Sequence, residues 1–339
     1  MTIHFFEPPA HLRVGGLDAA IQGMRSALTR HGVAVDSDAP SAPGDHVVHF
    51  HGLWQPAHSR LSHHLRPRGI PYIVSPHGML EPWAWRHKWW KKWPYFQLVE
   101  KRHLAGARAL LATGPMEATR LKRFAQPQQR IEWLPLGLTG DARPDYLRAR
   151  QQLGWSPEEQ VLLYLSRLHV KKGPDILLRA LASMKWPPVT RLVLVGDGER
   201  RFVDGLKRFA SEHAGALPRI DWPGEVWGDA RWKYFQGADL FCLPSHSENF
   251  GLAVLDACQV GTPVLTTADT PWANELAGRG YIAVPRLESV RSELARFFTA
   301  PRQTPEHRAT LADWAHTSFH WDRLAPRYVA LYESALAGS

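Results

Sequence analysis

Residues 239–265 constrain the fold of this chain more than any other stretch. The apolar run 240–243 is typical of a buried strand, and the polar loop after it contains Glu248. A helix is expected to open near residues 250–251, and residues 263–265 are typical of a second strand. In open α/β sheets, ligands bind at the carboxyl ends of the strands, and a helix N-terminus favours anions. The stretch therefore predicts an anion site with a carboxylate beside it.

Short apolar runs alternate with amphipathic or polar stretches along the chain, which predicts βαβ units and parallel sheets. Residues 137–144 are polar and rich in Gly and Pro, and the alternation restarts after them. We therefore expect an α/β protein of two doubly wound domains facing a cleft, divided at 145/146. The expected strands are 3–6, 47–50, 72–74, 109–112 and 131–134 in the first domain, and 161–165, 191–195, 240–243 and 264–265 in the second.

Composition is that of a globular protein, with 44% hydrophobic and 22% charged residues. The net charge of +9 is uneven, because residues 1–145 hold 18 Lys/Arg against 11 Asp/Glu. No zinc-finger spacing or RNP motif favours nucleic acid, so an anionic membrane or phosphate-bearing lipid is the better explanation. Two cysteines and no long apolar run predict a cytoplasmic protein that can lie against the inner face of the cytoplasmic membrane.

Several motifs follow one another in an order that resembles a known family. Residues 166–173, Ser-Arg-Leu-His-Val-Lys-Lys-Gly, precede an expected helix, and residues 192–199 contain Gly196-Asp-Gly. Asp256 follows Glu248 by eight residues. This set is similar to the family 4 retaining glycosyltransferases, whose acidic signature is E-x7-E. The loop Gly15-Gly16, residues 75–79 and residues 319–321 also fit, so the resemblance spans nearly the whole chain.

The resemblance implies the GT-B fold, with two Rossmann-like domains, 1–145 and 146–320, and a last helix at about 321–336 that packs back on the first. It also implies a nucleotide-diphosphate sugar as donor. Arg167 and Lys172 would hold the departing diphosphate, because preorganised cations stabilise charge that develops on a leaving group. Glu248 would meet the donor sugar. Asp256 would hold the ribose hydroxyls, where the family has the longer Glu.

Backbone groups would complete this site, again by resemblance. Glycine permits close approach of a ligand to the chain. His77, after strand 72–74, would contact the donor sugar or its reacting centre, whereas His49 and His51 are weaker candidates and a structural role is open for all three. The residues expected to contact the donor through their backbone are Gly15, Gly16, Gly196, Asn249, Phe250 and Gly251.

No metal or other cofactor is expected. The chain has no H-E-x-x-H and no Cys-x2-Cys element. The Arg/Lys pair and a helix dipole can neutralise the diphosphate instead.

Residues 83–103 hold five Trp and six Lys/Arg but one acid. Trp85, Trp89 and Trp93 recur at i,i+4 and would share one helical face, and Pro94 would end or restart that helix. Aromatic and cationic side chains together suit an anionic membrane interface. The alternative is that these tryptophans pack into the core of the first domain.

The sequence therefore predicts a retaining, metal-independent glycosyltransferase (EC 2.4, hexosyltransferase type) that uses a UDP- or GDP-linked sugar. Its expected acceptor is a saccharide or lipid-linked acceptor in bacterial polysaccharide or lipopolysaccharide synthesis. One alternative is a nucleotide-sugar epimerase of GT-B fold, for which Glu81 is the candidate acid/base carboxylate in the first domain. Another is a non-catalytic basic protein that binds sugar or nucleic acid.

Overall fold

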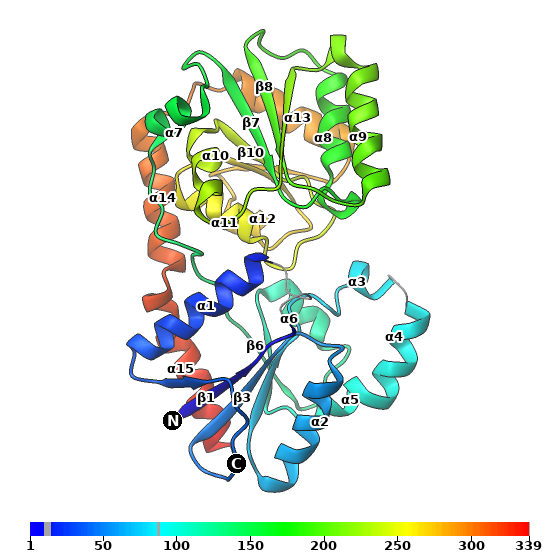
Figure 1. The fold of residues 1–339 in the computed structure, drawn as a ribbon, viewed down its shortest axis with the longest axis vertical. Coiled ribbons are helices and arrows are strands. Elements are labelled where there is room, and N and C mark those ends of the chain that lie inside the picture. The colour runs from blue at the N-terminus through cyan, green and yellow to red at the C-terminus, as the bar shows by residue number, and fades with distance from the viewer. Residues whose placement is uncertain (10–14, 87–88, 339) are drawn as a thin grey trace. The chain divides into compact units, whose positions relative to one another are not determined.

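A computed structural model of the chain describes residues 1–9, 15–86 and 89–338 (Figure 1). The chain divides into two compact units: unit 1 comprises Met1–Thr139 and Phe319–Ser339, and unit 2 comprises Gly140–Ser318. Each unit contains a six-stranded sheet with parallel strand pairs. The prediction of two doubly wound parallel sheets is confirmed.

The unit 1 sheet has the strand order β2-β1-β3-β4-β5-β6. Its helices lie on both faces, with α1 and α15 on one side and α2 and α5 on the other (Figure 1). The strands are β1 (Thr2–Phe6), β2 (Ala34–Asp36), β3 (His46–His51), β4 (Tyr72–Ser75), β5 (Ala109–Ala112) and β6 (Arg130–Trp133). The helices are α1 (Gly15–Arg30), α2 (Pro56–Leu65), α3 (Pro82–Arg86), α4 (Trp89–Tyr95), α5 (Lys101–Ala105), α6 (Pro115–Leu121) and α15 (Trp321–Ala337).

The unit 2 sheet has the order β12-β11-β10-β7-β8-β9, so the apolar strand β10 lies near its middle, between β7 and β11. Its strands are β7 (Gln160–Leu165), β8 (Thr190–Val195), β9 (Arg219–Gly224), β10 (Leu240–Cys242), β11 (Val264–Thr267) and β12 (Tyr281–Ala283). Its helices are α7 (Tyr146–Leu153), α8 (Pro174–Ala182), α9 (Arg200–Glu212), α10 (Trp232–Gly237), α11 (Leu252–Gln259), α12 (Trp272–Glu275), α13 (Leu287–Thr299) and α14 (Pro305–Phe319).

All nine expected strands are present, but the edge strands β2, β9 and β12 were not among them. β2 and β12 are three residues long, and neither β2 nor β9 contains a buried residue. Edge strands of this kind carry little hydrophobic signal, because only one side of them pairs with the sheet.

The tryptophans of residues 83–103 do not share the one helical face expected: Trp85 packs against Phe96 and Phe124, whereas Trp89 and Trp93 are more than half exposed. Trp85 lies on α3, whereas Trp89 and Trp93 lie on α4, and residues 87–88 fall outside the described residues. The chain continues through Pro94 to Tyr95 and then forms a π-helical turn, Phe96–Glu100, before α5. Pro94 therefore does not end the helix; a wider turn follows it, as is common where regular helical hydrogen bonding is disturbed.

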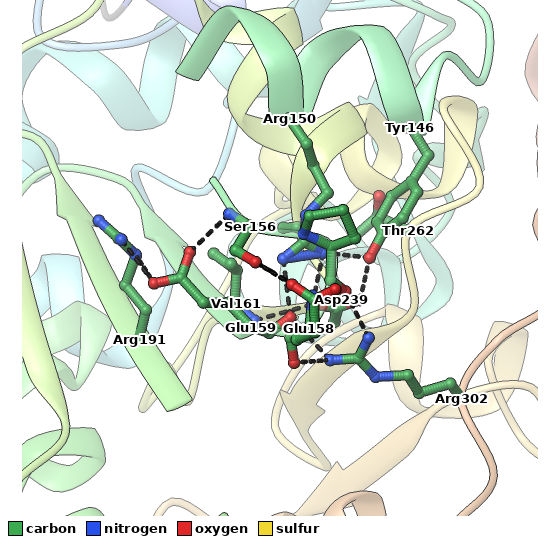
Figure 2. Close-up of polar contacts among 12 residues, drawn as sticks. Tyr146, Arg150, Ser156, Glu158, Glu159, Val161, Arg191, Asp239, Thr262 and Arg302 are labelled. Carbon is green, nitrogen blue, oxygen red and sulfur yellow. Dashed lines mark hydrogen bonds and ion pairs between the residues drawn. The ribbon is translucent and has the colours of Figure 1, made fainter. Parts of the chain in front are cut away.

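A buried polar network at the amino edge of the unit 2 sheet ties α7 to β7 and β10 (Figure 2). The carboxylate of Asp239, just before β10, accepts from the Val161 N–H at 2.8 Å and the Tyr146 hydroxyl at 2.7 Å. Arg150, 2% exposed, forms an ion pair with Asp239 at 3.1 Å. Arg302 donates to the backbone carbonyls of residues 157–159. These contacts fix the amino edge, the edge opposite to the ligand-binding edge of such sheets.

Burial of His103 in unit 1 generates a pH-dependence. Its ring stacks on Tyr72 at 5.6 Å and meets the edge of Phe50 at 4.9 Å, and neither ring nitrogen has a hydrogen-bond partner among the described residues. Burial lowers the pKa of His103 from 6.5 to about 3. Below about pH 6.5 the unfolded chain therefore binds a proton at His103 that the folded chain does not bind. The free energy of unfolding falls as the pH is lowered through this range.

The variant His103→Phe removes this titration while keeping an aromatic ring. When the pH is lowered from 7 to 5, the free energy of unfolding of the variant minus that of the parent should increase by about 2 kcal/mol. Urea denaturation of both proteins at both pH values measures this difference. His64→Phe, at an exposed position, is the control and should leave the difference unchanged. Equal pH-dependence in the parent and His103→Phe would contradict the prediction.

Candidate functional site

Three neighbouring strands of unit 2 end at one edge, and their loops carry most of the predicted site residues. β7 leads into the loop with Arg167 and Lys172, β8 leads into Gly196-Asp197-Gly198, and β10 leads into the loop with Glu248. The loops are bonded to one another through their backbones. The Leu168 N–H donates to the Asp197 carbonyl at 2.8 Å, and the His246 N–H donates to the Lys171 carbonyl at 2.8 Å.

An ion pair joins Lys172 to Glu248. The Lys172 Nζ lies 2.7 Å from Glu248 Oε1 and 2.8 Å from Oε2. The Ser245 hydroxyl donates to Oε1 at 2.6 Å. Both carboxylate oxygens thus have partners, although the Glu248 side chain is only 5% exposed and that of Lys172 19%. The sequence offered no sign of Ser245 as a partner beyond its position three residues before Glu248.

Burial alone would raise the pKa of Glu248, but the charge and hydrogen bonds of Lys172 and the Ser245 hydroxyl outweigh it, so the pKa lies below the ordinary value. Glu248 is therefore a carboxylate at neutral pH. A buried carboxylate with a fixed cation can accept hydrogen bonds from sugar hydroxyls, and the cation can meet a phosphate oxygen. This pair is the chemical centre of the candidate site.

Close approach of the loops explains three glycines. A Cβ on Gly196, whose φ is +137°, would lie 2.0 Å from the Ser166 carbonyl oxygen. A Cβ on Gly198 would lie 1.9 Å from the Leu168 carbonyl oxygen, and one on Gly173, at φ +68°, 2.2 Å from that of Pro244. Backbone contacts of this kind cannot relax around a side chain. Glycine here lets the β7 loop pack against its neighbours on both sides.

Arg167 is exposed, and its carbonyl accepts a hydrogen bond from the buried Tyr164 hydroxyl at 3.0 Å. The contact holds the backbone of Arg167 while its side chain extends into solvent. The Asp197 carboxylate accepts from the Gly198 N–H at 2.8 Å. Asp197 therefore stabilises the turn itself.

The three residues before α11 are Asn249, Phe250 and Gly251, and they differ in what they can offer a ligand. Phe250 is 5% exposed and packs against Trp272 at 5.2 Å, so its side chain belongs to the core and its backbone alone can face a ligand. Gly251, at φ +80°, precedes the first residue of α11. Asn249 lies directly after Glu248 in the same loop.

Asp256 lies within α11 and is 6% exposed. Arg231 Nε lies 3.2 Å from its Oδ2, and the Arg231 guanidinium stacks over the ring of Trp232 at 4.1 Å. Nothing in the sequence singles out Arg231, because its partner Asp256 is 25 residues away. Trp227 is 67% exposed.

In unit 1, histidines gather at the carboxyl ends of β3 and β4. The rings of His51 and His77 are parallel within 11°, and His51 Nδ1 lies 3.1 Å from His77 Nε2. His49 contacts the Tyr332 hydroxyl of α15 at 2.8 Å and Ser75 Oγ at 2.7 Å. Burial lowers the pKa of His77 to about 4 and that of His49 to about 3, so both rings are neutral at pH 7.

A buried carboxylate fixes the turn that carries His77. This residue has a φ of +50°, which is uncommon for a side chain other than Gly. Glu117 of α6 accepts from the Gly78 N–H at 2.6 Å and from the Thr113 N–H at 2.8 Å. Arg120, on the next turn of α6, forms an ion pair with Glu81. No sequence pattern singles out Glu117, because its partners lie up to 39 residues away.

Gly15 and Gly16 are the first two residues of α1. They were expected at the end of a loop before the helix, so the helix begins two residues earlier than predicted.

Metal ligation has no candidate in the part of the chain that the structure describes, since no three His, Cys, Asp or Glu side chains there could hold an ion together. The chain does contain one Asp-x-Asp element, Asp36-Ser-Asp38. Asp36 Oδ1 there accepts the N–H groups of Ser37 and Asp38, so it stabilises a turn at an edge strand.

Two family models match the chain, and they meet between the two units. "Glycosyltransferase Family 4" matches residues 45–139, and "Glycosyl transferases group 1" matches residues 145–305. The solved sucrose-phosphate synthase of Thermosynechococcus elongatus is 19% identical and superposes with a TM-score of 0.78 over 100% of both chains. Anabaena Alr3699/HepE, solved with UDP-glucose, is 19% identical with a TM-score of 0.73, over 98% of this chain and 100% of that one.

A curated relative, the D-inositol 3-phosphate glycosyltransferase of Segniliparus rotundus, is 32% identical over 264 residues. The match covers 72% of this chain and 56% of the relative, so the chain spans about half the length of that relative. Both matching family models describe glycosyltransferases and support an assignment of the chain to family 4, and the solved structures confirm the two-domain GT-B class of fold.

The buried ion pair makes a prediction about stability. In Lys172→Met, Glu248 stays buried without its cation, its pKa should rise, and the free energy of unfolding at pH 7 should fall by about 3 kcal/mol in urea denaturation. Adding Glu248→Gln should recover most of that loss, because the uncompensated charge is then removed as well. If the single variant is as stable as the parent, the pair does not compensate a buried charge.

Proposed function

We propose that this chain is a retaining glycosyltransferase that moves a sugar from a UDP- or GDP-linked donor to the hydroxyl of a saccharide or lipid-linked acceptor. The observation that carries the proposal is the Lys172–Glu248 pair, held at the carboxyl edge of a parallel sheet with Arg167 in the same loop. The match of residues 45–139 to the family 4 model and a neighbour solved with UDP-glucose support it.

The residues divide the work between the two halves of the donor. The bond from the anomeric carbon to the diphosphate breaks, and negative charge grows on the leaving oxygens. Lys172 and Arg167 supply cations for that charge. Glu248 accepts hydrogen bonds from the sugar hydroxyls and orients the ring. The acceptor oxygen then bonds to the same face of the anomeric carbon, and its proton goes to the departing phosphate.

Asp256 would accept hydrogen bonds from the ribose. The Arg231 guanidinium lies beside it, with Nε 3.2 Å from Asp256 Oδ2. The proposed reaction needs no metal, because Lys172 and Arg167 take the role of the divalent cation at the diphosphate.

The acceptor has two candidates. A cell-surface polysaccharide or lipopolysaccharide intermediate is the first candidate. It agrees with the positive charge of residues 1–145, which contain 18 Lys/Arg and 11 Asp/Glu. A phosphorylated polyol is the second candidate, because the relative from Segniliparus rotundus is named a D-inositol 3-phosphate glycosyltransferase. Transfer of radiolabelled sugar to inositol 3-phosphate, set against transfer to a lipid-linked saccharide, separates them.

The rival functions have less support. An epimerase would need an acid/base carboxylate in unit 1, and its candidate Glu81 is 2% exposed and ion-paired with Arg120. A non-catalytic binding protein would have no need for a buried Lys–Glu pair, which costs desolvation of two charges.

A nucleotide series tests the donor site. Thermal unfolding with UDP, GDP, ADP or dTDP in the presence of EDTA should show one nucleotide that raises Tm, since a ligand at 100 times its Kd adds about 2.7 kcal/mol to the free energy of unfolding.

Arg167→Ala should lower the rate of sugar transfer roughly 10²- to 10³-fold, as the loss of one preorganised donor does.

Lys171→Ala is the matched control, because Lys171 precedes Lys172 directly but has no proposed contact with the diphosphate. It should retain most of the rate. A protein that no nucleotide stabilises, with Arg167→Ala as active as the parent, would contradict the proposed donor site.

A further inference from the structure

A groove of about 500 Å³ runs along the tryptophan-rich segment of unit 1. One wall comes from α4, the π turn and α5, with Trp93, Gln97 and Lys101. The other comes from the residues after α6, with Arg123 and Gln126. We call this groove and the exposed tryptophans beside it the tryptophan surface.

The floor of the groove is aromatic. The rings of Trp85, Phe96 and Phe124 lie 5.4 to 5.5 Å from one another, two pairs edge-to-face or nearly so. Phe96 is 6% exposed, and Trp85 and Phe124 pack against the unit 1 core. The floor is therefore rigid and apolar, and it belongs to the folded unit rather than to a loose helix.

Large apolar side chains continue from the groove into solvent. Trp89 is 58% exposed, Trp90 60%, Trp93 53% and Leu98 69%. Trp93, Gln97 and Lys101 line the groove, and Trp89 lies one helical turn before Trp93 on α4. Three of these side chains are tryptophans from one short helix, which is a cluster rather than the scattered exposure of an ordinary surface.

The charged side chains that line the groove, Lys101 and Arg123, are both cationic. Glu100, the one acid of residues 83–103, faces away: it is 1% exposed, and its Oε1 accepts the Trp54 N–H at 2.7 Å. The segment therefore contributes its cations to the surface and keeps its carboxylate inside.

We infer that the tryptophan surface docks on the anionic face of a lipid bilayer. Amphipathic indole rings are stable at the boundary between headgroups and hydrocarbon, and each cation near an anionic leaflet adds to binding. The apolar floor accepts chain methylenes while Lys101 and Arg123 meet headgroup phosphates. A second copy of this chain fits less well, because it would bring the same cations to the contact. Among the described residues no helix has an apolar stretch long enough to span a bilayer, so the contact is one of surface docking.

Vesicle sedimentation with the full chain tests the inference. The parent should bind vesicles of phosphatidylcholine that contain about 30 mol% phosphatidylglycerol, and it should not bind vesicles of phosphatidylcholine alone. Its affinity for the anionic vesicles should fall as the salt concentration rises. Lys101→Glu/Arg123→Glu should weaken binding roughly 25-fold or more, since each cation lost costs about fivefold.

Arg68→Glu/Arg108→Glu is the matched control, because these exposed residues lie in unit 1 outside the groove. Each reversal removes two charge units, so both double variants change the net charge from +9 to +5. The control should keep most of the binding. Equal loss in both doubles would show a general charge effect and would overturn the inference.

Quenching by lipids with brominated chains locates the rings. Parent fluorescence should be quenched on binding, and Trp89→Ala/Trp93→Ala should lose most of that quenching, whereas Trp133→Ala, at a position 41% exposed on β6, should keep it. The inference would be contradicted if the parent does not bind anionic vesicles. It would also be contradicted if the parent forms a dimer in solution through the tryptophan surface. The nucleotide-induced rise in Tm should persist in every variant, so failure here is distinct from failure of the donor site.

Discussion

Two charges, those of Lys172 and Glu248, are removed from water at the carboxyl edge of the unit 2 sheet, and the surrounding loops depend on their compensation. Isolated, either charge would cost several kcal/mol. Together, with the Ser245 hydroxyl as a third partner, they hold the loops after β7 and β10 at hydrogen-bonding distance. The arrangement that compensates these two charges is also the one that, in the proposed function, would receive a phosphate at the cation and sugar hydroxyls at the carboxylate.

The amino edge of the unit 2 sheet, opposite the Lys172–Glu248 pair, is built differently. Asp239 and Arg150 close the amino edge with buried hydrogen bonds to the starts of β7 and α7 (Figure 2). The carboxyl edge has glycines instead, where Gly173, Gly196 and Gly198 let backbones approach within distances that no Cβ permits. One edge of the sheet is thus closed by buried polar side chains, and the other by backbone contacts between loops that only glycine permits.

Much of this could be predicted because it is local in sequence. Apolar runs of two to five residues located the central strands, and Lys172 and Glu248 stand in recognisable motifs beside them. Long-range pairings could not be predicted: Arg231 with Asp256 and Glu117 with Gly78 join residues that no spacing rule connects. The i,i+4 pattern of tryptophans also misled, because Trp85 turns inward to Phe96 whereas Trp89 and Trp93 are exposed to solvent.

The central claim is that Lys172 holds the diphosphate and Glu248 the sugar. Isothermal titration of the parent, Lys172→Met and Glu248→Gln with a nucleoside diphosphate and with its sugar conjugate tests it most directly. Glu248→Gln should weaken the sugar conjugate at least tenfold more than the free diphosphate, since a hydrogen bond to a charged group contributes about 1.5–3 kcal/mol. Lys172→Met should weaken both ligands alike. Equal loss of the two ligands in Glu248→Gln, or no loss in either variant, would contradict the claim.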